Sequence, residues 1–327
     1  MNREKSMSAI LGIDVAKSKF DVALYRDGKY KHKVFDNNPA GFDTLAAWLQ
    51  QHNVPEVHAC LEATGAYGDG VARFLFEAGH TVSVVNPARI KAYGKSELLR
   101  TKNDKTDAKL IARFCEAHKP PAWRPDPPEI EHLRLLGRRR EALIGMRTQE
   151  LNRLGGPDYA VNESVEKVIA FLNQEIEQIS TSIKEHIGKH DGLRKKRELL
   201  KSIPGVGEVT IEAILSEING FEGFDTVEKV VAFMGLSPKD HESGTSVKGK
   251  PKLCKIGNAR LRKVLYMPTL SAIQHNPFVT ALYNRLMAKS KNGMIIACAC
   301  MKKLVHIIYG VIKTGKPFDP AYNIKTA

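Results

Sequence analysis

The run ILGIDVAKSKFDVALY, residues 10–25, decides how the first part of the chain folds. Apolar residues fill Ala9–Val15, and a second apolar run, Phe20–Tyr25, begins after a short polar break. Runs of this length and composition predict two consecutive β-strands. Asp14 lies near the end of the first predicted strand, at the edge where an open sheet places its chemistry.

Outward from this run, the pattern continues with strands and helices in alternation. Further strands are predicted at Val57–Glu62 and Thr81–Val85. Helical patterns lie at Phe42–Gln51, Gly68–Ala78 and Lys105–Ala117. The order of three strands, helix, strand, helix, strand, helix predicts a mixed sheet covered by helices. By analogy at the level of the fold, this is the order of an RNase H-like α/β domain, to which we assign residues 1–118.

A proline-rich segment, KPPAWRPDPP, follows at residues 119–128. Its prolines exclude a helix and favour a stiff, extended linker. After it, Glu129–Arg153 and Ser164–Leu200 carry charged and apolar residues at helical spacing and predict two long helices. Such a charged helical hairpin forms no large core alone, so we expect it to pack on a partner or a second copy, as coiled coils do. Residues 119–200 are therefore predicted to be a hinge and a coiled-coil middle.

The remaining residues, 201–327, predict a third, mainly helical domain with a strongly basic character. The whole chain has a formal charge of +14, but the charge is unevenly placed. Between Pro251 and Ala327 there are thirteen Lys or Arg residues and one acidic residue, Asp319. A merely solubilising surface mixes both signs, whereas a field of one sign attracts a polyanion. We therefore expect a nucleic-acid partner.

Four carboxylates are candidates for a catalytic site. Glu62, like Asp14, ends an apolar strand, and Asp104 and Asp107 lie three residues apart at a predicted helix start, so both face the same way. Four gathered carboxylates repel one another unless divalent cations neutralise them, and Mg²⁺ prefers carboxylate oxygen. Two such ions can flank a scissile phosphate. Taken singly, each acid is explained better by a cap or a surface charge, and Asp104 would make a good N-cap. The combination of two acids that end strands and a pair of acids on a later helix is far less common by chance.

A serine-containing segment, HESGTSVKGKPKLCKIGNARLR, occupies residues 241–262. In it, Ser243 precedes Gly244, which leaves room for a close approach by phosphate. The cations that follow are Lys248, Lys250, Lys252, Lys255, Arg260 and Arg262. A hydroxyl among cations is a plausible nucleophile at phosphorus. By composition alone, a loop that only contacts DNA phosphates explains the segment better than a nucleophile does.

The turn PGVG, residues 204–207, is a second candidate for phosphate binding. Gly205 and Gly207 precede a predicted helix, as in the hairpin of helix-hairpin-helix modules, whose backbone amides hold DNA phosphates. A plain turn between two helices is the alternative.

Other classes of protein are disfavoured. We expect no membrane span, because the best apolar run, Met294–Cys300, is cut short by Lys302 and Lys303. The N-terminal residues carry no signal sequence, so we expect a cytoplasmic protein. None of the five cysteines has the spacing of a zinc site, and we expect reduced thiols.

Six segments, in this order, resemble the IS-one-ten family of insertion-sequence recombinases, the DEDD transposases, over nearly the whole chain. They are GIDVAKSKFDVAL, LEATGAYGDGVARFL, VNPARIKAYGKSELLRTKNDKTDAKLIARF, SIPGVGEVTI, FMGLSPKDHESGTSVKGK and KIGNARLRKVLYMPTLSA. The third and the last are the most specific.

The resemblance implies a RuvC-like N-terminal domain with a catalytic, Mg²⁺-binding quartet of Asp14, Glu62, Asp104 and Asp107. It also implies a C-terminal transposase domain with Ser243 as the catalytic serine, although Ser246 lies close enough to leave the choice open. Such a recombinase acts on double-stranded donor and target DNA and is guided by a structured bridge RNA that pairs with both. Since recombining two duplexes needs more than one active site, we expect a homo-oligomer, a dimer or a tetramer.

Three alternatives compete with this hypothesis. A RuvC-type, Mg²⁺-dependent, structure-selective endonuclease would share the carboxylates but need no serine domain. A sugar kinase of the actin-like class would need a later strand ending in Asp-Gly-Gly or similar, which the sequence lacks. A non-catalytic nucleic-acid-binding protein would cleave no strand in the presence of Mg²⁺.

Overall fold

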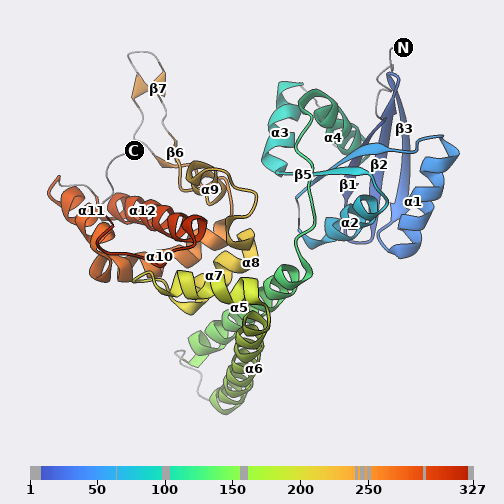
Figure 1. Ribbon diagram of the computed structural model, residues 1–327. Coiled ribbons are helices and arrows are strands. Elements are labelled where there is room, and N and C mark those ends of the chain that lie inside the picture. The colour runs from blue at the N-terminus through green and yellow to red at the C-terminus, as the bar shows by residue number, and fades with distance from the viewer. Residues whose placement is uncertain are drawn as a thin grey trace. The chain divides into compact units, whose positions relative to one another are not determined.

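The computed structural model (Figure 1) describes residues 9–63, 65–97, 104–154, 161–239, 242–243, 247–248, 252–289 and 292–322. Contacts divide the chain into two compact units, Met1–Pro125 and Asp126–Ala327, each with a hydrophobic core of its own. The first unit is built on a β-sheet, and the second is almost entirely helical.

The first unit contains a five-stranded mixed sheet with the order β3-β2-β1-β4-β5. The strands are β1 (Ala9–Val15), β2 (Lys19–Arg26), β3 (Lys29–Asp36), β4 (Val57–Glu62) and β5 (Thr81–Val85). Strands β1, β4 and β5 are parallel, whereas β2 and β3 run antiparallel to their neighbours. The predicted mixed sheet with helices is therefore confirmed, and the bounds of β1, β4 and β5 agree with the predicted ones.

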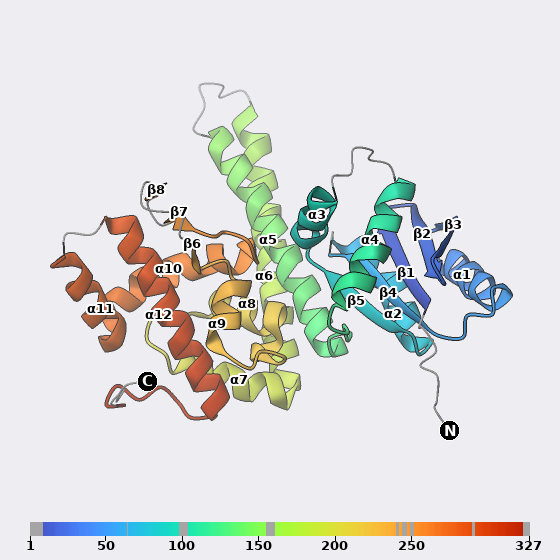
Figure 2. The same cartoon turned by 90° about the horizontal axis from the view of Figure 1, so that it is seen from above.

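Helices cover both faces of this sheet. They are α1 (Pro39–Gln51), α2 (Asp69–Glu77), α3 (Pro87–Ser96) and α4 (Asp104–His118), with a short 3-10 turn, η1 (Ala66–Gly68). Residues of α1 and α2 pack with Leu11 and Ile13 of β1 on one face. Residues of α3 and α4 pack with Cys60 and Ala23 on the other (Figure 2).

Helix α4 lies unusually close to the sheet because β1 has a glycine beneath it. A Cβ atom on Gly12 would lie 2.2 Å from the carbonyl oxygen of Ala108 and 2.4 Å from the amide nitrogen of Ala112. Any side chain at position 12 would therefore push α4 away from β1. The small side chains of Ala23, Ala108 and Ala112 complete this close contact.

The second unit begins at the end of the proline-rich segment. Its helices are α5 (Pro128–Leu154), α6 (Asn162–Lys189), α7 (Asp191–Lys201), α8 (Glu208–Ile218), α9 (Val227–Phe233), α10 (Ala259–His275), α11 (Pro277–Met287) and α12 (Gly293–Thr314), with a 3-10 turn, η3 (Asn219–Phe221). Helices α5 and α6 lie side by side as a long pair in both views (Figures 1 and 2). The prediction of one helix over Ser164–Leu200 is wrong, because His190 is extended (φ −108°, ψ 108°) and separates α6 from α7.

The predicted three-part division differs from the two units that the contacts define. Ile130 and Leu133 of α5, and Ile183 and Ile187 of α6, belong to the same core cluster as α7–α12. The base of the helical pair is thus part of the C-terminal core rather than a separate domain. The first half of the predicted hinge belongs to the first unit, where the Trp123 amide donates to the Val82 carbonyl of β5 (2.6 Å).

Helix α12 corrects the expectation about apolar runs. Within the described ranges, it is the one helix whose length and composition would allow it to span a membrane. Much of it is nevertheless core, since Ile296, Cys300, Leu304, Val305 and Ile308 are buried in the cluster shared with α7–α10. The lysines that follow its first turns do not end the helix, because Lys302 and Lys303 lie on a partly exposed side.

The predicted serine segment forms two nested antiparallel ladders between α9 and α10. The outer ladder pairs β6 (Pro238–Lys239) with β9 (Lys252–Leu253), and the inner one pairs β7 (Glu242–Ser243) with β8 (Val247–Lys248).

Candidate active site

Two predicted catalytic acids lie side by side at the carboxyl edge of the sheet. Strands β1 and β4 are parallel and in register, with Ile13 opposite Leu61. Asp14 and Glu62 are the next residues on each strand, and both are half-buried. Because neighbouring residues at the same level of a sheet project to the same face, the two carboxylates share the face that α4 covers.

The predicted acidic pair on α4 begins at the same edge. Lys19, at the start of β2, contacts Asp104 at the start of α4, whereas Tyr25, near the end of β2, interacts with Glu116 near the end of α4. Helix α4 therefore starts beside the edge that carries Asp14. Asp104 and Asp107 lie in its first turn, where a helix dipole favours negative charge.

Lys19 holds Asp104 in this structure. Its Nζ atom lies 3.0 Å from Asp104 Oδ2 and 3.7 Å from Asp21 Oδ2. The hydrogen bond between them raises the pKa of Lys19 and lowers the pKa of Asp104. Both side chains are about half exposed, so this ion pair contributes little to stability.

The donor chemistry and the placement of the four acids fit a divalent metal, but the ligands are not gathered around one point. Carboxylate oxygens are the ligands that Mg²⁺ prefers. Within the described part of the chain, however, no three His, Cys, Asp or Glu side chains lie close enough together to hold an ion. The four predicted ligands share one face of the sheet, and their convergence on a common ion stays a prediction.

A buried acid that was not among the predicted site residues lies beside the site. Asp21 lies directly opposite Asp14 in the β1–β2 ladder and is only 5% exposed. His32 on β3 donates from Nε2 to Asp21 Oδ1 (2.8 Å), since an ionised carboxylate can only accept. The sequence signal was Asp21 itself, a charged residue inside an apolar strand. Its partner His32 comes from β3, and that contact was not recognisable in the sequence; Lys19, two residues before Asp21 on β2, also reaches it.

For the predicted serine site, the structure describes the backbone of the hairpin. Ser243 lies in β7 opposite Val247, and Lys248 and Lys252 lie in β8 and β9. Ser246 and Lys250 lie outside the described residues.

The root of this hairpin is fixed on both sides. Arg262 donates from Nη1 to the carbonyl oxygens of Met234 (3.0 Å) and Lys255 (3.4 Å), which precede and follow the hairpin. A Cβ atom on Gly257 would lie 2.2 Å from the Phe233 carbonyl oxygen, so a glycine is needed where the two ends meet. Arg262, predicted to contact nucleic acid, therefore has a structural contact that orients the serine segment.

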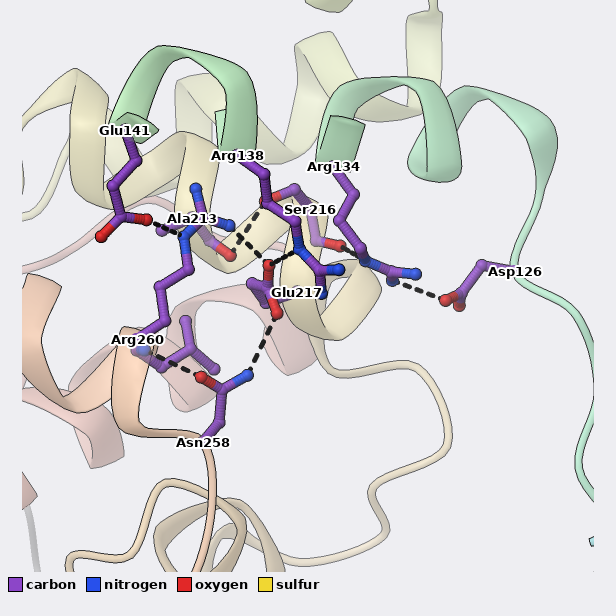
Figure 3. Close-up of polar contacts among 10 residues, drawn as sticks. Asp126, Arg134, Arg138, Glu141, Ala213, Ser216, Glu217, Asn258 and Arg260 are labelled. Carbon is purple, nitrogen blue, oxygen red and sulfur yellow. Dashed lines mark hydrogen bonds and ion pairs between the residues drawn. The ribbon is translucent and has the colours of Figure 1, made fainter. Parts of the chain in front are cut away.

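Arg260, also predicted to contact nucleic acid, belongs to an ion-pair network that joins α5, α8 and α10 (Figure 3). It donates to Glu141 (2.6 Å) and to the buried Glu217 (2.5 Å), and Glu217 also accepts from Asn258 (3.1 Å). Burial would raise the pKa of Glu217, but Arg138, Asn258 and Arg260 together hold it below its usual value. The network thus fixes the start of α10, where the serine segment ends.

Replacing Glu217 by Gln is expected to destabilise the protein by about 3 kcal/mol at pH 7, because it removes the anion from a buried ion pair. Since the pKa of Glu217 is lowered on folding, the stabilisation is present above the unfolded pKa of about 4.3 and is lost as the pH falls below it. Urea unfolding at pH 7 and pH 4 measures both effects. Glu163→Gln, at an exposed ion pair on α6, serves as the control and should change stability by less than about 1 kcal/mol. Equal losses in the two variants would contradict this account.

The PGVG turn joins α7 to α8, a position that both the helix-hairpin-helix hypothesis and a plain turn between two helices require. Gly205 has a positive φ of 94°, and a Cβ atom there would lie 2.7 Å from Ala272 of α10. Gly205 therefore faces the protein interior. Gly207 is the N-cap of α8 and has open space around it, so its neighbourhood is the more accessible to a phosphate.

Two family models match the chain. One, for the DEDD transposase of IS110 and described as "Transposase", matches residues 11–156. The other, described as "Transposase IS116/IS110/IS902 family", matches residues 197–284. The carboxylate-bearing unit and the serine-bearing unit thus each match a transposase model.

Similar proteins cover nearly the whole chain. A "Pilin gene-inverting protein" from Moraxella lacunata is 33% identical, covering 94% of this chain and 97% of its own length. A protein of the same name from Moraxella bovis is 32% identical over the same shares. The "Transposase for insertion sequence element IS1111A" from Coxiella burnetii is 24% identical, covering 95% of this chain and 92% of its own length.

One solved structure has a weak similarity to the chain. It is T. thermophilus RuvC in complex with a Holliday junction substrate, with a TM-score of 0.27 and 13% identity, covering 36% of this chain and 99% of that chain. This TM-score is too low to support the fold assignment.

Acidic residues at one edge of a sheet fit metal-assisted chemistry on phosphates, and a C-terminal region nearly free of acids fits a nucleic-acid partner, so the two features together fit an enzyme that acts on nucleic acid. The matches define the class more closely, as a transposase or DNA recombinase. The chain belongs to the IS110 family of transposases.

Proposed function

We propose that this protein is an RNA-guided DNA recombinase that cuts and rejoins donor and target strands through a covalent serine–DNA intermediate. The first unit would be a RuvC-like domain of the RNase H-like fold. The observation that carries the proposal is the arrangement of acids at one edge of the sheet. Asp14 and Glu62 follow paired residues of β1 and β4. Gly12 allows α4, whose first turn carries Asp104 and Asp107, to pack closely on the same face.

The carboxylates would hold Mg²⁺, which when bound supplies charge stabilisation at the scissile phosphate. Asp14 and Glu62 come from rigid neighbouring strands, so their spacing is set by the sheet. Asp104 and Asp107 come from the first turn of a helix, and Asp104 would exchange Lys19 for the ion. Lys19 would then be free to approach a DNA phosphate.

Ser243 would be the nucleophile. Its hydroxyl oxygen forms a bond to phosphorus as the bond from phosphorus to the leaving strand oxygen breaks, and that oxygen takes up the proton that serine loses. In the second step, the hydroxyl of another strand end attacks the same phosphorus and releases serine. Because the number of phosphoester bonds is conserved, no external energy source is required.

The proposed partners follow from this chemistry. Donor and target DNA would be double-stranded, and a structured bridge RNA would select them by base pairing. Strand exchange between two duplexes requires several active sites, so the protein would act as a dimer or a tetramer. The basic C-terminal region would bind the nucleic acids with a steep salt dependence. We place the reaction in the cytoplasm.

A RuvC-type endonuclease is the alternative function. It would use the acidic edge of the first unit but leave the serine hairpin and its fixed root without a role. The names of the relatives, a gene-inverting protein and several transposases, favour rejoining over simple cleavage.

A recombination assay tests the proposal. Purified protein is mixed with plasmids that carry donor and target sites, with or without RNA transcribed from the non-coding DNA beside the gene. We expect new donor–target junctions, measured by amplification across them, only when both RNA and Mg²⁺ are present. Junctions formed without the RNA would contradict RNA guidance. Cleavage of branched DNA without rejoining would favour the endonuclease.

A further inference from the structure

Two adjoining hollows follow α12 on the side where α11 and the C-terminal segment pack against it. The first, of about 510 Å³, lies between α11 and α12 and includes Arg285, Lys302, Lys303 and His306. The second, of about 540 Å³, shares Phe278, Lys303 and His306 with the first. It continues past Lys316, Phe318 and Tyr322. Because they share three residues, the two hollows form one continuous surface, which we call the α11–α12 groove.

The cations of the α11–α12 groove lack acidic partners. Within the described ranges, Arg285, Lys302 and Lys303 form no ion pair, whereas Arg260 in the same unit pairs with two glutamates. The sequence contains no acid from Ser243 to Phe318, and Asp319, which lines the second hollow, forms no ion pair with these cations in the described structure. Burial, together with the charge of Arg285, lowers the pKa of Lys303. Such a concentration of uncompensated charge is stabilised by an anion from outside the chain.

His306 adds a hydrogen-bonding group at the junction of the two hollows. Its Nε2 atom is buried and has no hydrogen-bond partner among the described residues. Burial and the nearby Lys302 lower the pKa of the His306 side chain, so its imidazole is neutral at physiological pH. A neutral imidazole can donate to or accept from a ligand hydroxyl.

The second hollow supplies aromatic surface. The ring of Phe278 packs edge-on against Phe318, with their centroids 5.7 Å apart, and Lys303 Nζ lies 6.0 Å from the Phe278 centroid. The side chain of Tyr322 is 66% exposed. A row of cations that leads to an exposed aromatic ring is an arrangement by which proteins hold single strands, with phosphates on the cations and a base on the ring.

We propose that the α11–α12 groove binds a single-stranded segment of RNA, with its phosphates against Arg285, Lys302 and Lys303 and an unpaired base against Tyr322. The hollows, of about 510 and 540 Å³, suit a single strand, because they are too small to take in a duplex. The hydroxyl partner that His306 lacks is available on the ribose of RNA and missing from DNA. This inference rests on the proposed function, since it gives the RNA partner a docking site in the second unit.

The test is the binding of a fluorescently labelled oligo(U) to the full-length protein, followed by anisotropy over a range of salt concentrations. The variant Arg285→Gln/Lys303→Gln keeps polar, flexible side chains and removes two charges from the groove. Lys289→Gln/Lys313→Gln removes two charges from exposed positions of the same two-helix region that do not line the groove. Both double variants have the same net charge, so a difference between them reports the groove rather than the overall field.

We expect the groove variant to bind oligo(U) at least about tenfold more weakly than the control variant. The slope of log affinity against log salt should fall by about 1.4 for two lost phosphate contacts on a single strand. His306→Ala should reduce the preference for oligo(U) over oligo(dT). Thermal melting of each variant checks that the unit remains folded, so that a loss of binding is not a loss of structure.

The outcomes separate this inference from the proposed function. If the two double variants bind oligo(U) with equal affinity, whether or not both bind more weakly than the wild type, the proposal that the groove binds RNA is refuted. A stronger effect on oligo(dT), or on duplex DNA, than on oligo(U) would refute it as well. Binding is measured without any reaction, so the two hypotheses can fail separately. If the wild-type protein does not recombine DNA but the groove variant still binds oligo(U) more weakly than the control, the proposed function is refuted and the RNA-binding role of the groove is supported.

Discussion

Ser243→Ala is expected to bind donor DNA normally and to form no covalent protein–DNA adduct. The methyl group of alanine has no oxygen to bond to phosphorus, so the first step of the proposed reaction is lost entirely rather than slowed. Recombination should fall by at least about 10³-fold, as for the removal of other catalytic nucleophiles. Adducts are trapped on a labelled DNA substrate, resolved on denaturing gels and assigned by peptide mapping.

Ser246→Ala is the matched control, because it removes a hydroxyl three residues away in the same segment. It should keep adduct formation and at least part of the recombination activity. The assignment fails if the adduct maps to Ser246 or to any other residue, or if Ser243→Ala recombines fully. If neither variant nor the wild type forms an adduct while strands are still cleaved, the endonuclease is favoured.

The sheet of the first unit was predictable because its signals are local. Alternating and continuous apolar runs mark β1, β4 and β5, and the order of the elements restricts how such strands pair. The placement of Asp14 and Glu62 at strand ends then brings them to one edge without any further information. The acidic pair on α4 was predicted for the same reason, since Asp104 begins the helix and the three-residue spacing sets a common face.

Other elements were missed although local signals existed. Helix α3 begins with Asn86 as N-cap and Pro87 in the first turn, a start signal that the charged sequence after it obscured. The break at His190 has no comparable signal, because the helical pattern continues through it. The chain bends between α6 and α7 because Leu193 and Leu200 of α7 are buried in the core of the second unit.

The roles of the basic residues could not be predicted, because the sequence does not show which acid each cation meets. Arg260 stands in a basic run, but its partners Glu141 and Glu217 come from α5 and α8. Arg285 and Lys303, which look ordinary in the sequence, lack ion pairs in the described structure. Which cations are paired within the protein is therefore visible only in the fold, and not in the charge density along the chain.

A truncation cannot locate the nucleic-acid surface of the second unit. Removing Pro251–Ala327 would delete α10, α11 and α12, whose residues Leu261, Leu304 and Ile308 are buried in the core of the second unit. The shortened protein would lose binding because it unfolds. Charge-removing substitutions on an intact fold are the experiment that separates the two causes.

Asp14→Asn is expected to reduce recombination by roughly 10³-fold, about 4 kcal/mol of transition-state stabilisation, while leaving the fold intact. The amide has the shape of the carboxylate but not its charge, so it is a poor ligand for Mg²⁺. Asp14 lies directly opposite the buried Asp21, and like charges opposite one another in a ladder are destabilising. The variant should therefore melt at the same temperature as the wild type or slightly above it. Junction formation and thermal melting measure the two effects.

Asp27→Asn is the control, because it makes the same chemical change in the same sheet at an exposed turn. Asp27 has a φ of 52°, a conformation that asparagine adopts readily, so neither stability nor activity should change. If Asp14→Asn and Asp27→Asn recombine equally well, the acidic edge is not the catalytic site. A carboxylate that is kept for metal binding beside another carboxylate costs stability, so its removal should not lower the melting temperature. If Asp14→Asn instead melts well below the wild type, the charge of Asp14 stabilises the fold. Loss of activity with no loss of stability is the combination that identifies a residue retained for chemistry alone.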